Sequence, residues 1–300
     1  MKKFVFAVLS AFLLFGCGSD NEMGVSNQHP KDVEVICPIV IESSDADYSY
    51  NYIYAEGKLI SSLFSSSDSY SNTVSTYQYN AQGLLSEAKE ERGDFGVTTS
   101  YEYDETDRLT AFTVRHSSGA LRNKKMKHPR SPLYQLLTKR RYSSNARSGS
   151  SETQDDYYEY QYKAGEFYPH KMVSNFYEGG EKVSVGVNFE YTAGNLSRLT
   201  YTDAFDGDQV EFLMAYDDKP LSKASVPFAL RFGNLLFAVN NLTHTEVLYN
   251  GKLAWEEKLE HSYSENGLID TTKLTYVEYD VKGEISYSEV QSLKSSYQCD

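Results

Sequence analysis

Apolar and polar residues alternate with a period of two along much of the chain. The run from 183 to 192 has Val, Val, Val, Phe and Tyr at its odd positions and Ser, Gly, Asn, Glu and Thr at its even positions. The run from 253 to 263 repeats the alternation, with Leu253, Trp255, Leu259 and Tyr263 against Glu256, Lys258 and Glu260. Strand side chains alternate between two faces, and one wet face is typical of antiparallel sheets covered on one side. The pattern predicts an all-β fold.

A short motif recurs within this alternation. It consists of two aromatic positions separated by one residue, a polar turn with Gly or Asp, and then Leu or Ile. The clearest copies contain Tyr52 and Tyr54, Tyr77 and Tyr79, and Tyr101 and Tyr103, and weaker copies contain Tyr160, Phe189, Tyr263 and Tyr279. Gly and Asp tolerate the positive φ of tight hairpin turns, and a fixed period indicates a repeated supersecondary unit. We therefore expect an antiparallel meander of β-hairpin repeats.

The ends of such a sheet need protection, because open edges invite aggregation. Pairing the first strand (33 to 41) with the last (285 to 299) would remove both edges. The sequence thus predicts a large curved or closed, barrel-like sheet with one or two short helices. The helices are expected at Ser131 to Leu137, followed by Lys139 to Arg141, and within Val226 to Asn240.

The N-terminus has the features of an export signal. Lys2 and Lys3 precede an apolar run from 4 to 15, too short to span a bilayer stably. The following residues, Leu14 to Cys17, resemble the lipobox of bacterial lipoproteins, which implies that Cys17 is acylated. We expect a signal peptide at 1–16, a flexible tether at 17–32 and one β-repeat domain at 33–300. The absence of Asp beside the cysteine favours an outer-membrane lipid-anchored protein, on the periplasmic face or the cell surface.

The segment from 101 to 110 looks like the YD repeat of RHS-type shell proteins. The matching residues are Tyr103, Asp104, Arg108, Leu109 and Thr110, and Asp107 stands where the repeat has glycine. Together, the lipobox, the tyrosine-rich hairpins and the length are similar to an uncharacterised bacterial lipoprotein family thought to have a porin-like β fold. This resemblance implies no enzymatic activity.

Two cysteines remain after Cys17 is assigned to lipid. Cys37 and Cys299 lie near opposite ends of the mature chain, and two cysteines in an oxidising compartment usually pair. We expect a disulfide between them, which would hold the first strand beside the last. The alternative is two separate thiols, one beside Pro38 and one at the terminus.

Basic residues concentrate in one segment, although the chain as a whole is acidic. The stretch from 115 to 147 has ten Lys or Arg and no acid, and we interpret about 115–150 as an insertion into the β-repeat domain. A possible anion-binding surface comprises Arg122, Lys124, Lys125, Lys127, Arg130, Lys139, Arg140 and Arg141. A long solvated loop is the competing interpretation.

Composition narrows the classes of function. A net charge of −13 excludes a broad phosphate-binding surface, so no nucleic-acid partner is expected. The 14% aromatic content argues against disorder, because these rings can bury surface. The six histidines are scattered and are expected to be solvated or in turns. The carboxylates between 203 and 211 do not have the spacing of a calcium loop. We expect no metal, no cofactor and no catalytic residue.

These observations favour a non-catalytic membrane-anchored lipoprotein, a binding or scaffolding module at the outer membrane. Its expected partners are the membrane, through the lipid anchor, and a glycan or another envelope protein. The alternative function is a carbohydrate-binding accessory of an outer-membrane uptake system, which needs exposed aromatic rings. A transmembrane β-barrel is a third candidate, weakened by charges such as Glu87, Lys89 and Glu91 on the polar faces. A hydrolase is the fourth, since paired carboxylates meet in space and not in sequence.

Overall fold

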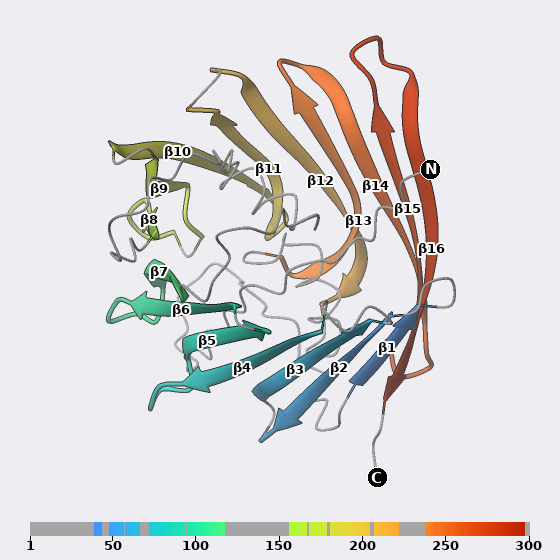
Figure 1. Ribbon diagram of the computed structural model, residues 1–300, viewed down its shortest axis with the longest axis horizontal. Helices are drawn as coiled ribbons and strands as arrows, with labels where there is room; N and C mark the ends of the chain where they lie inside the picture. The colour runs from blue at the N-terminus through green and yellow to red at the C-terminus, as the bar shows by residue number, and fades with distance from the viewer. Residues whose placement is uncertain are drawn as a thin grey trace.

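In the computed structural model, sixteen antiparallel strands form one closed barrel (Figure 1). The structure describes residues 39–43, 48–56, 58–66, 72–93, 95–117, 156–166, 168–178, 181–204, 207–221 and 238–297. The first eight strands are β1 (Ile39–Ser43), β2 (Tyr48–Ala55), β3 (Lys58–Ser66), β4 (Thr73–Tyr79), β5 (Leu85–Arg92), β6 (Phe95–Tyr103), β7 (Leu109–Ser117) and β8 (Asp156–Gln161). The other eight are β9 (Lys171–Glu178), β10 (Glu181–Thr192), β11 (Asn195–Thr202), β12 (Gln209–Pro220), β13 (Asn240–Tyr249), β14 (Lys252–Tyr263), β15 (Ile269–Tyr279) and β16 (Ile285–Tyr297).

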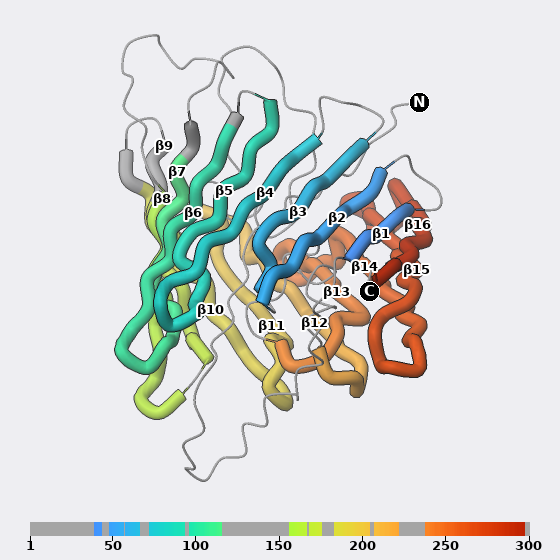
Figure 2. The backbone as a smooth tube through the Cα atoms, turned by 90° about the horizontal axis from the view of Figure 1, so that it is seen from below, coloured from blue at the N-terminus to red at the C-terminus, as the bar shows by residue number. Residues whose placement is uncertain are grey.

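Closure of the barrel depends on β1, which pairs with both its sequence neighbour and the last strand. Ile39 lies opposite Tyr52 of β2 on one side and Tyr297 of β16 on the other. The remaining strands pair in chain order, so their path around the wall is a simple meander (Figure 2). The predicted all-β antiparallel meander and its closure are thus confirmed. The last strand begins at Ile285, as expected, and the first extends to Ser43.

The described residues contain no helix, and so no helix among them is long and apolar enough to cross a membrane. The first segment expected to be helical, 131–141, and residues 226–237 of the second, 226–240, lie outside the described residues. The end of the second expected segment is described, and there Asn240 begins strand β13.

The two faces of the wall differ in polarity as the alternation predicts. In β10, Val185, Val187 and Phe189 are buried, whereas Ser184 and Asn188 are exposed. Buried side chains from strands around the whole wall form one hydrophobic cluster, so the buried face is the inner face. Large rings contribute to it: Tyr50 and Tyr52 are only 2% and 1% exposed.

Four hairpin turns share one pattern of backbone hydrogen bonds, and each begins with a residue that caps the turn: Asn80, Asp104, Ser264 and Asp280. In the β6–β7 turn, the Asp104 carboxylate accepts hydrogen bonds from the backbone N–H groups of Thr106 (2.9 Å) and Arg108 (3.0 Å). Burial raises the pKa of Asp104, but the hydrogen bonds from Thr106 and Arg108 outweigh it and lower the pKa to about 2. Asp107 has φ +62°, and the equivalent residues of the other three turns are Gly83, Gly267 and Gly283. Asp tolerates this left-handed region better than most residues, which explains why it can replace the glycine of the repeat.

The second tyrosine of the repeat faces its Leu or Ile across the hairpin. A β-bulge accompanies each of these pairs, because the register shifts by one residue there. The pairs are Tyr54 with Leu59, Tyr79 with Leu85, Tyr103 with Leu109, Tyr191 with Leu196, Tyr263 with Ile269 and Tyr279 with Ile285.

At five places around the wall, a tyrosine hydroxyl then joins one hairpin to its neighbour. Leu85 pairs with β4, but the β5–β6 ladder begins only at Glu87. The Tyr103 hydroxyl donates a hydrogen bond to the Leu85 carbonyl at 2.8 Å. The same link recurs from Tyr79 to Leu59, from Tyr162 to Leu109, from Tyr216 to Leu196 and from Tyr297 to Ile269, at 2.7–2.8 Å. Backbone carbonyls that lack a strand partner need such a donor.

These tyrosines form a ring at one end of the barrel. Even-numbered strands run in the same direction, so their C-terminal ends meet at the same end. Each has a tyrosine there, and we call this set of described residues the tyrosine ring: Tyr54, Tyr79, Tyr103, Tyr162, Tyr191, Tyr216, Tyr263 and Tyr297. Burial raises the pKa of Tyr103, and the hydroxyls of Tyr79 and Tyr162 raise it further. Burial likewise raises the pKa of Tyr297 to about 12. The hydroxyls therefore remain protonated donors at neutral pH.

Tyr103→Phe tests this link. The substitution keeps the ring but removes the donor, leaving the Leu85 carbonyl without its hydroxyl partner. We expect the free energy of unfolding to fall by about 1–2 kcal/mol, measured by denaturant titration. Tyr157→Phe is the matched control, because Tyr157 lies on the outer wall and is 36% exposed. It should change stability by less than about 0.5 kcal/mol. Equal effects of the two substitutions would contradict a special role for the ring.

The register also sharpens the prediction of a disulfide, although Cys37 and Cys299 lie outside the described residues. Ile39 of β1 pairs with Tyr297 of β16. If the same register continues for two more residues along each strand, Cys37 pairs with Cys299. Neighbouring strands meet the requirement that the Cα atoms of a disulfide lie within about 7 Å. Mass spectrometry of a non-reduced digest should find the two peptides linked, and free thiols in protein isolated from the envelope would refute the bond.

Candidate functional site

Most residues that the sequence singled out lie outside the described part of the chain. These are Cys17, Cys37, Cys299 and the eight residues of the possible anion-binding surface, Arg122 to Arg141. The described strands flank the basic insertion: Arg115 lies in β7 with its side chain exposed, and β7 pairs directly with β8. Lipidation, the disulfide and anion binding therefore stay predictions.

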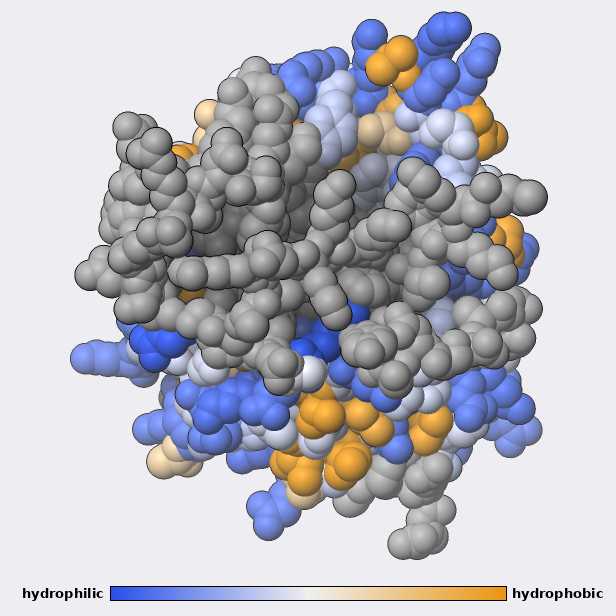
Figure 3. Space-filling model, in the orientation of Figure 1, coloured by the Kyte–Doolittle hydropathy of each residue, from blue (hydrophilic) through white to orange (hydrophobic). Residues whose placement is uncertain are grey.

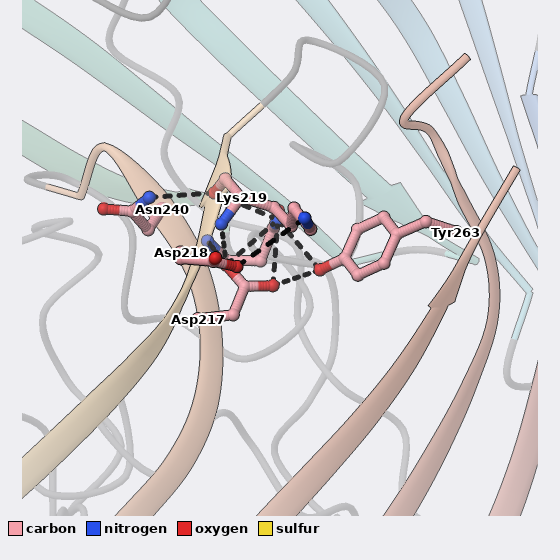
Figure 4. Close-up of polar contacts among 6 residues, drawn as sticks. Asp217, Asp218, Lys219, Asn240 and Tyr263 are labelled. Carbon is pink, nitrogen blue, oxygen red and sulfur yellow. Dashed lines mark hydrogen bonds and ion pairs between the residues drawn. The ribbon is translucent and has the colours of Figure 1, made fainter. Parts of the chain in front are cut away.

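Among the described residues, a polar network stands out where the tyrosine ring reaches β12, β13 and β14 (Figure 4). The Tyr263 hydroxyl donates to the Asp217 carboxylate instead of to a backbone carbonyl. The same carboxylate accepts hydrogen bonds from the backbone N–H groups of Lys219 (3.0 Å) and Asn241 (3.1 Å). The Asn241 amide, on a residue only 2% exposed, donates to the Tyr263 oxygen at 3.0 Å.

A second set of hydrogen bonds holds together the residues that directly precede and follow 222–237. Leu221 N–H donates to the Val239 carbonyl at 2.8 Å. The Asn195 side-chain oxygen accepts from the backbone N–H groups of Val239 (2.8 Å) and Asn240 (3.0 Å). The Asn240 amide in turn donates to the Lys219 carbonyl at 2.9 Å. The network thus ties β11, β12 and β13 together at this end of the barrel.

His261 takes over the role that a ring tyrosine has elsewhere. Leu242 lies opposite Tyr216, as the leucines of the repeat do, but its carbonyl is 2.9 Å from His261 Nε2. A carbonyl can only accept, so Nε2 carries the proton. Nδ1 then accepts from the Thr272 hydroxyl at 2.9 Å. This neutral tautomer frees the Tyr263 hydroxyl for Asp217.

Burial lowers the pKa of His261, against the opposing effects of the Leu242 carbonyl and the Asp217 carboxylate. The expectation that the histidines are solvated or in turns is therefore wrong for His261, which lies half-buried in β14. Both ring nitrogens of His261 and the Asp217 carboxylate already have hydrogen-bond partners within the protein. We therefore assign this polar network a structural role, which is to hold the strands together at this end of the barrel.

The outer wall has a different cluster on β13 and β14. His244 Nε2 lies 3.2 Å from Glu256 Oε2 and 3.8 Å from Glu246 Oε1. Ligand atoms of these three residues all lie within 4.8 Å of one another, the arrangement among the described residues that could hold a metal ion. His244 lies in strand β13 and not in a turn, and its partly exposed side chain on the outer wall agrees with the expectation of a solvated histidine. Asn250 and Gly251, with positive φ, mark the tight turn between these strands, but a bulge at Val247 and Leu248 shifts the register, so the turn alone does not reveal that Glu246 faces Glu256.

Comparison with known proteins supports the fold. No protein-family model matches the chain, and no curated protein matches it. Among solved structures, the chain is similar to a porin-like protein from Bacteroides uniformis ATCC 8492, at 10% identity and a TM-score of 0.52 over 89% of this chain and 98% of that one. A porin-like protein from Bacteroides vulgatus ATCC 8482 matches at 10% identity and a TM-score of 0.45, over 88% and 98% of the two chains. At this identity, the first likeness shows that the chain shares the fold of a porin-like protein.

The lowered pKa of His261 predicts a pH dependence. Below the ordinary value of 6.5, the unfolded state binds a proton at His261 that the folded state resists, so acidification favours unfolding. The free energy of unfolding should therefore fall as pH drops through about 6.5. His261→Gln should flatten this part of the curve, measured by denaturant titration between pH 5 and 7.5. His244→Gln on the outer wall is the control, and an equal flattening there would contradict the assignment to His261.

Proposed function

We propose that this protein is a non-catalytic lipoprotein, anchored to the outer membrane through Cys17, whose barrel stands in water as a binding or scaffolding module. The polarity of the wall is the observation that supports this proposal. A barrel that spans a membrane turns an apolar band about 25 Å tall towards lipid and keeps a polar interior. In this barrel, a continuous hydrophobic cluster lies on the inner wall, although a few polar side chains are buried beside it, and ion pairs lie on the outer wall. Hydrophobic side chains gather on only part of the surface (Figure 3), and on β2 to β4 Ile53, Ile60, Leu63 and Val74 are 37–43% exposed.

Ion pairs lie on the outer face of strands around the wall. Glu87 and Lys89 are 3.0 Å apart, Arg198 and Glu211 are 2.8 Å apart, and Lys273 and Glu260 are 2.9 Å apart. All these charges would face hydrocarbon if the wall crossed a bilayer, where a basic residue near the midplane costs about 2–4 kcal/mol. The inner face, by contrast, has the continuous hydrophobic cluster. A lipid at Cys17 supplies membrane attachment without requiring the wall to enter the bilayer.

The inner wall also weighs against an aqueous pore. Barrels of 16–18 strands that act as porins enclose a polar, water-filled channel. Here Tyr52, Val187 and Phe212, from well-separated strands, point inward and are at most 1% exposed. A binding or scaffolding role fits this wall better than diffusion of solutes.

The carbohydrate-binding alternative requires rings that are free to stack on sugars. The described tyrosines lie mostly on the inner wall, within the ring or the hydrophobic cluster, and Tyr157 is the exposed one among them. Packing within the barrel therefore accounts for the described tyrosines better than sugar binding does.

Cys17→Ser tests the anchor. We expect the variant to move from the membrane fraction to the soluble fraction of the envelope, because the acyl chains contribute about 0.8 kcal/mol for each buried CH₂ group. Ser19→Ala is the matched control and should leave the protein with the membrane. Retention of the Cys17→Ser variant after a carbonate wash would overturn the proposal and favour insertion of the barrel itself.

A further inference from the structure

The cluster of His244, Glu246 and Glu256 has a geometry that suits a metal ion. Glu246 and Glu256 are direct cross-strand partners of β13 and β14, and His244 is two residues before Glu246 on the same outer face. Two ligand atoms about 2 Å from one tetrahedral ion lie about 3.3 Å apart. His244 Nε2 is 3.2 Å and 3.8 Å from the two carboxylates, close to that separation.

The carboxylates of Glu246 and Glu256 face each other, and a cation between them would reduce their mutual repulsion. Like charges directly across an antiparallel pair destabilise it, and Glu256 is only 8% exposed, which weakens screening by water. Lys258 offsets part of this repulsion, since its ammonium lies 3.0 Å from Glu256 Oε2. Its side chain is 53% exposed, however, so it can swing into solvent when an ion binds.

A further contact orients the buried carboxylate. The Tyr279 hydroxyl donates to Glu256 Oε1 at 2.7 Å, which leaves Oε2 directed at His244. Hydrogen bonds of this kind to the outer atom of a ligand typically change metal affinity by 10–100-fold. An imidazole nitrogen beside two carboxylate oxygens suits zinc and its neighbours in the transition series better than Ca²⁺ or Mg²⁺, which prefer oxygen ligands alone.

We propose that His244, Glu246 and Glu256 bind a divalent transition-metal ion on the outer wall, with the remaining coordination positions taken by water. Lys258 competes with the ion for Glu256, and Tyr279 is a positioning residue for that carboxylate. The ion would bridge β13 and β14 on the face opposite to His261.

Isothermal titration of the chelator-treated, lipid-anchored protein in detergent with Zn²⁺ tests the proposal. We expect one saturable site whose affinity falls at least tenfold in His244→Gln and in Glu256→Gln. Tyr279→Phe should weaken binding about tenfold. Lys258→Met should strengthen binding, because it removes the competing ammonium. This gain separates a metal site from a purely structural salt-bridge cluster, which would show no gain.

Two controls make the result decisive. Glu211→Gln removes a carboxylate from a comparable outer-wall network around Arg198, which has no histidine, and it should leave Zn²⁺ affinity unchanged. Titration with Ca²⁺ or Mg²⁺ alone should give no saturable binding at this site. Zn²⁺ affinity that is unchanged in His244→Gln, or unchanged in Lys258→Met, would overturn the proposal.

Discussion

The hydrogen bond from a tyrosine hydroxyl to the backbone carbonyl of the neighbouring hairpin is the interaction on which this barrel depends. The hairpins β2–β3, β4–β5, β6–β7, β10–β11 and β14–β15 each have a bulge at this end, where a Leu or Ile pairs with one neighbouring strand but not with the other. A carbonyl left there needs a donor that reaches across the gap between hairpins. Tyrosine provides a long, rigid side chain with a donor at its tip, whereas phenylalanine has no donor and serine is too short. This requirement accounts for part of the chain's 26 tyrosines.

The same link explains where the pattern changes. Between β12 and β13 the hairpin is interrupted by residues 222–237, and at this place His261 donates to the Leu242 carbonyl. Tyr263 then pairs with Asp217, which holds the N–H groups of Lys219 and Asn241. Because His261 replaces the ring tyrosine as the donor to Leu242, the Tyr263 hydroxyl is available for the polar network beside residues 222–237.

Successive side chains of a strand point to opposite faces of the wall, so the polar groups of the molecule are divided between its inner and outer faces. His261 and Lys258 lie on the same strand, three residues apart, and therefore point to opposite faces. Burial lowers the pKa of the inward group, and the outward group joins the His244 and carboxylate cluster on the outer wall. An apolar inner face with ion pairs outside stabilises a barrel surrounded by water, because burial removes apolar area from solvent while the charges remain hydrated.

The sequence alone determined the strands, their faces and the hairpin turns, since period-two alternation and turn residues such as Gly83 and Asp104 act locally. It also indicated closure, because an open sheet of this length would leave two edges. It did not reveal the tyrosine ring, although it marked the tyrosines, because the donor and acceptor of each link lie on separate hairpins. Likewise, nothing local placed Asp217 beside Tyr263, 46 residues away, or Glu256 beside Tyr279. Only the register of the closed barrel, set by bulges and by the pairing of β1 with β16, decided which side chains meet.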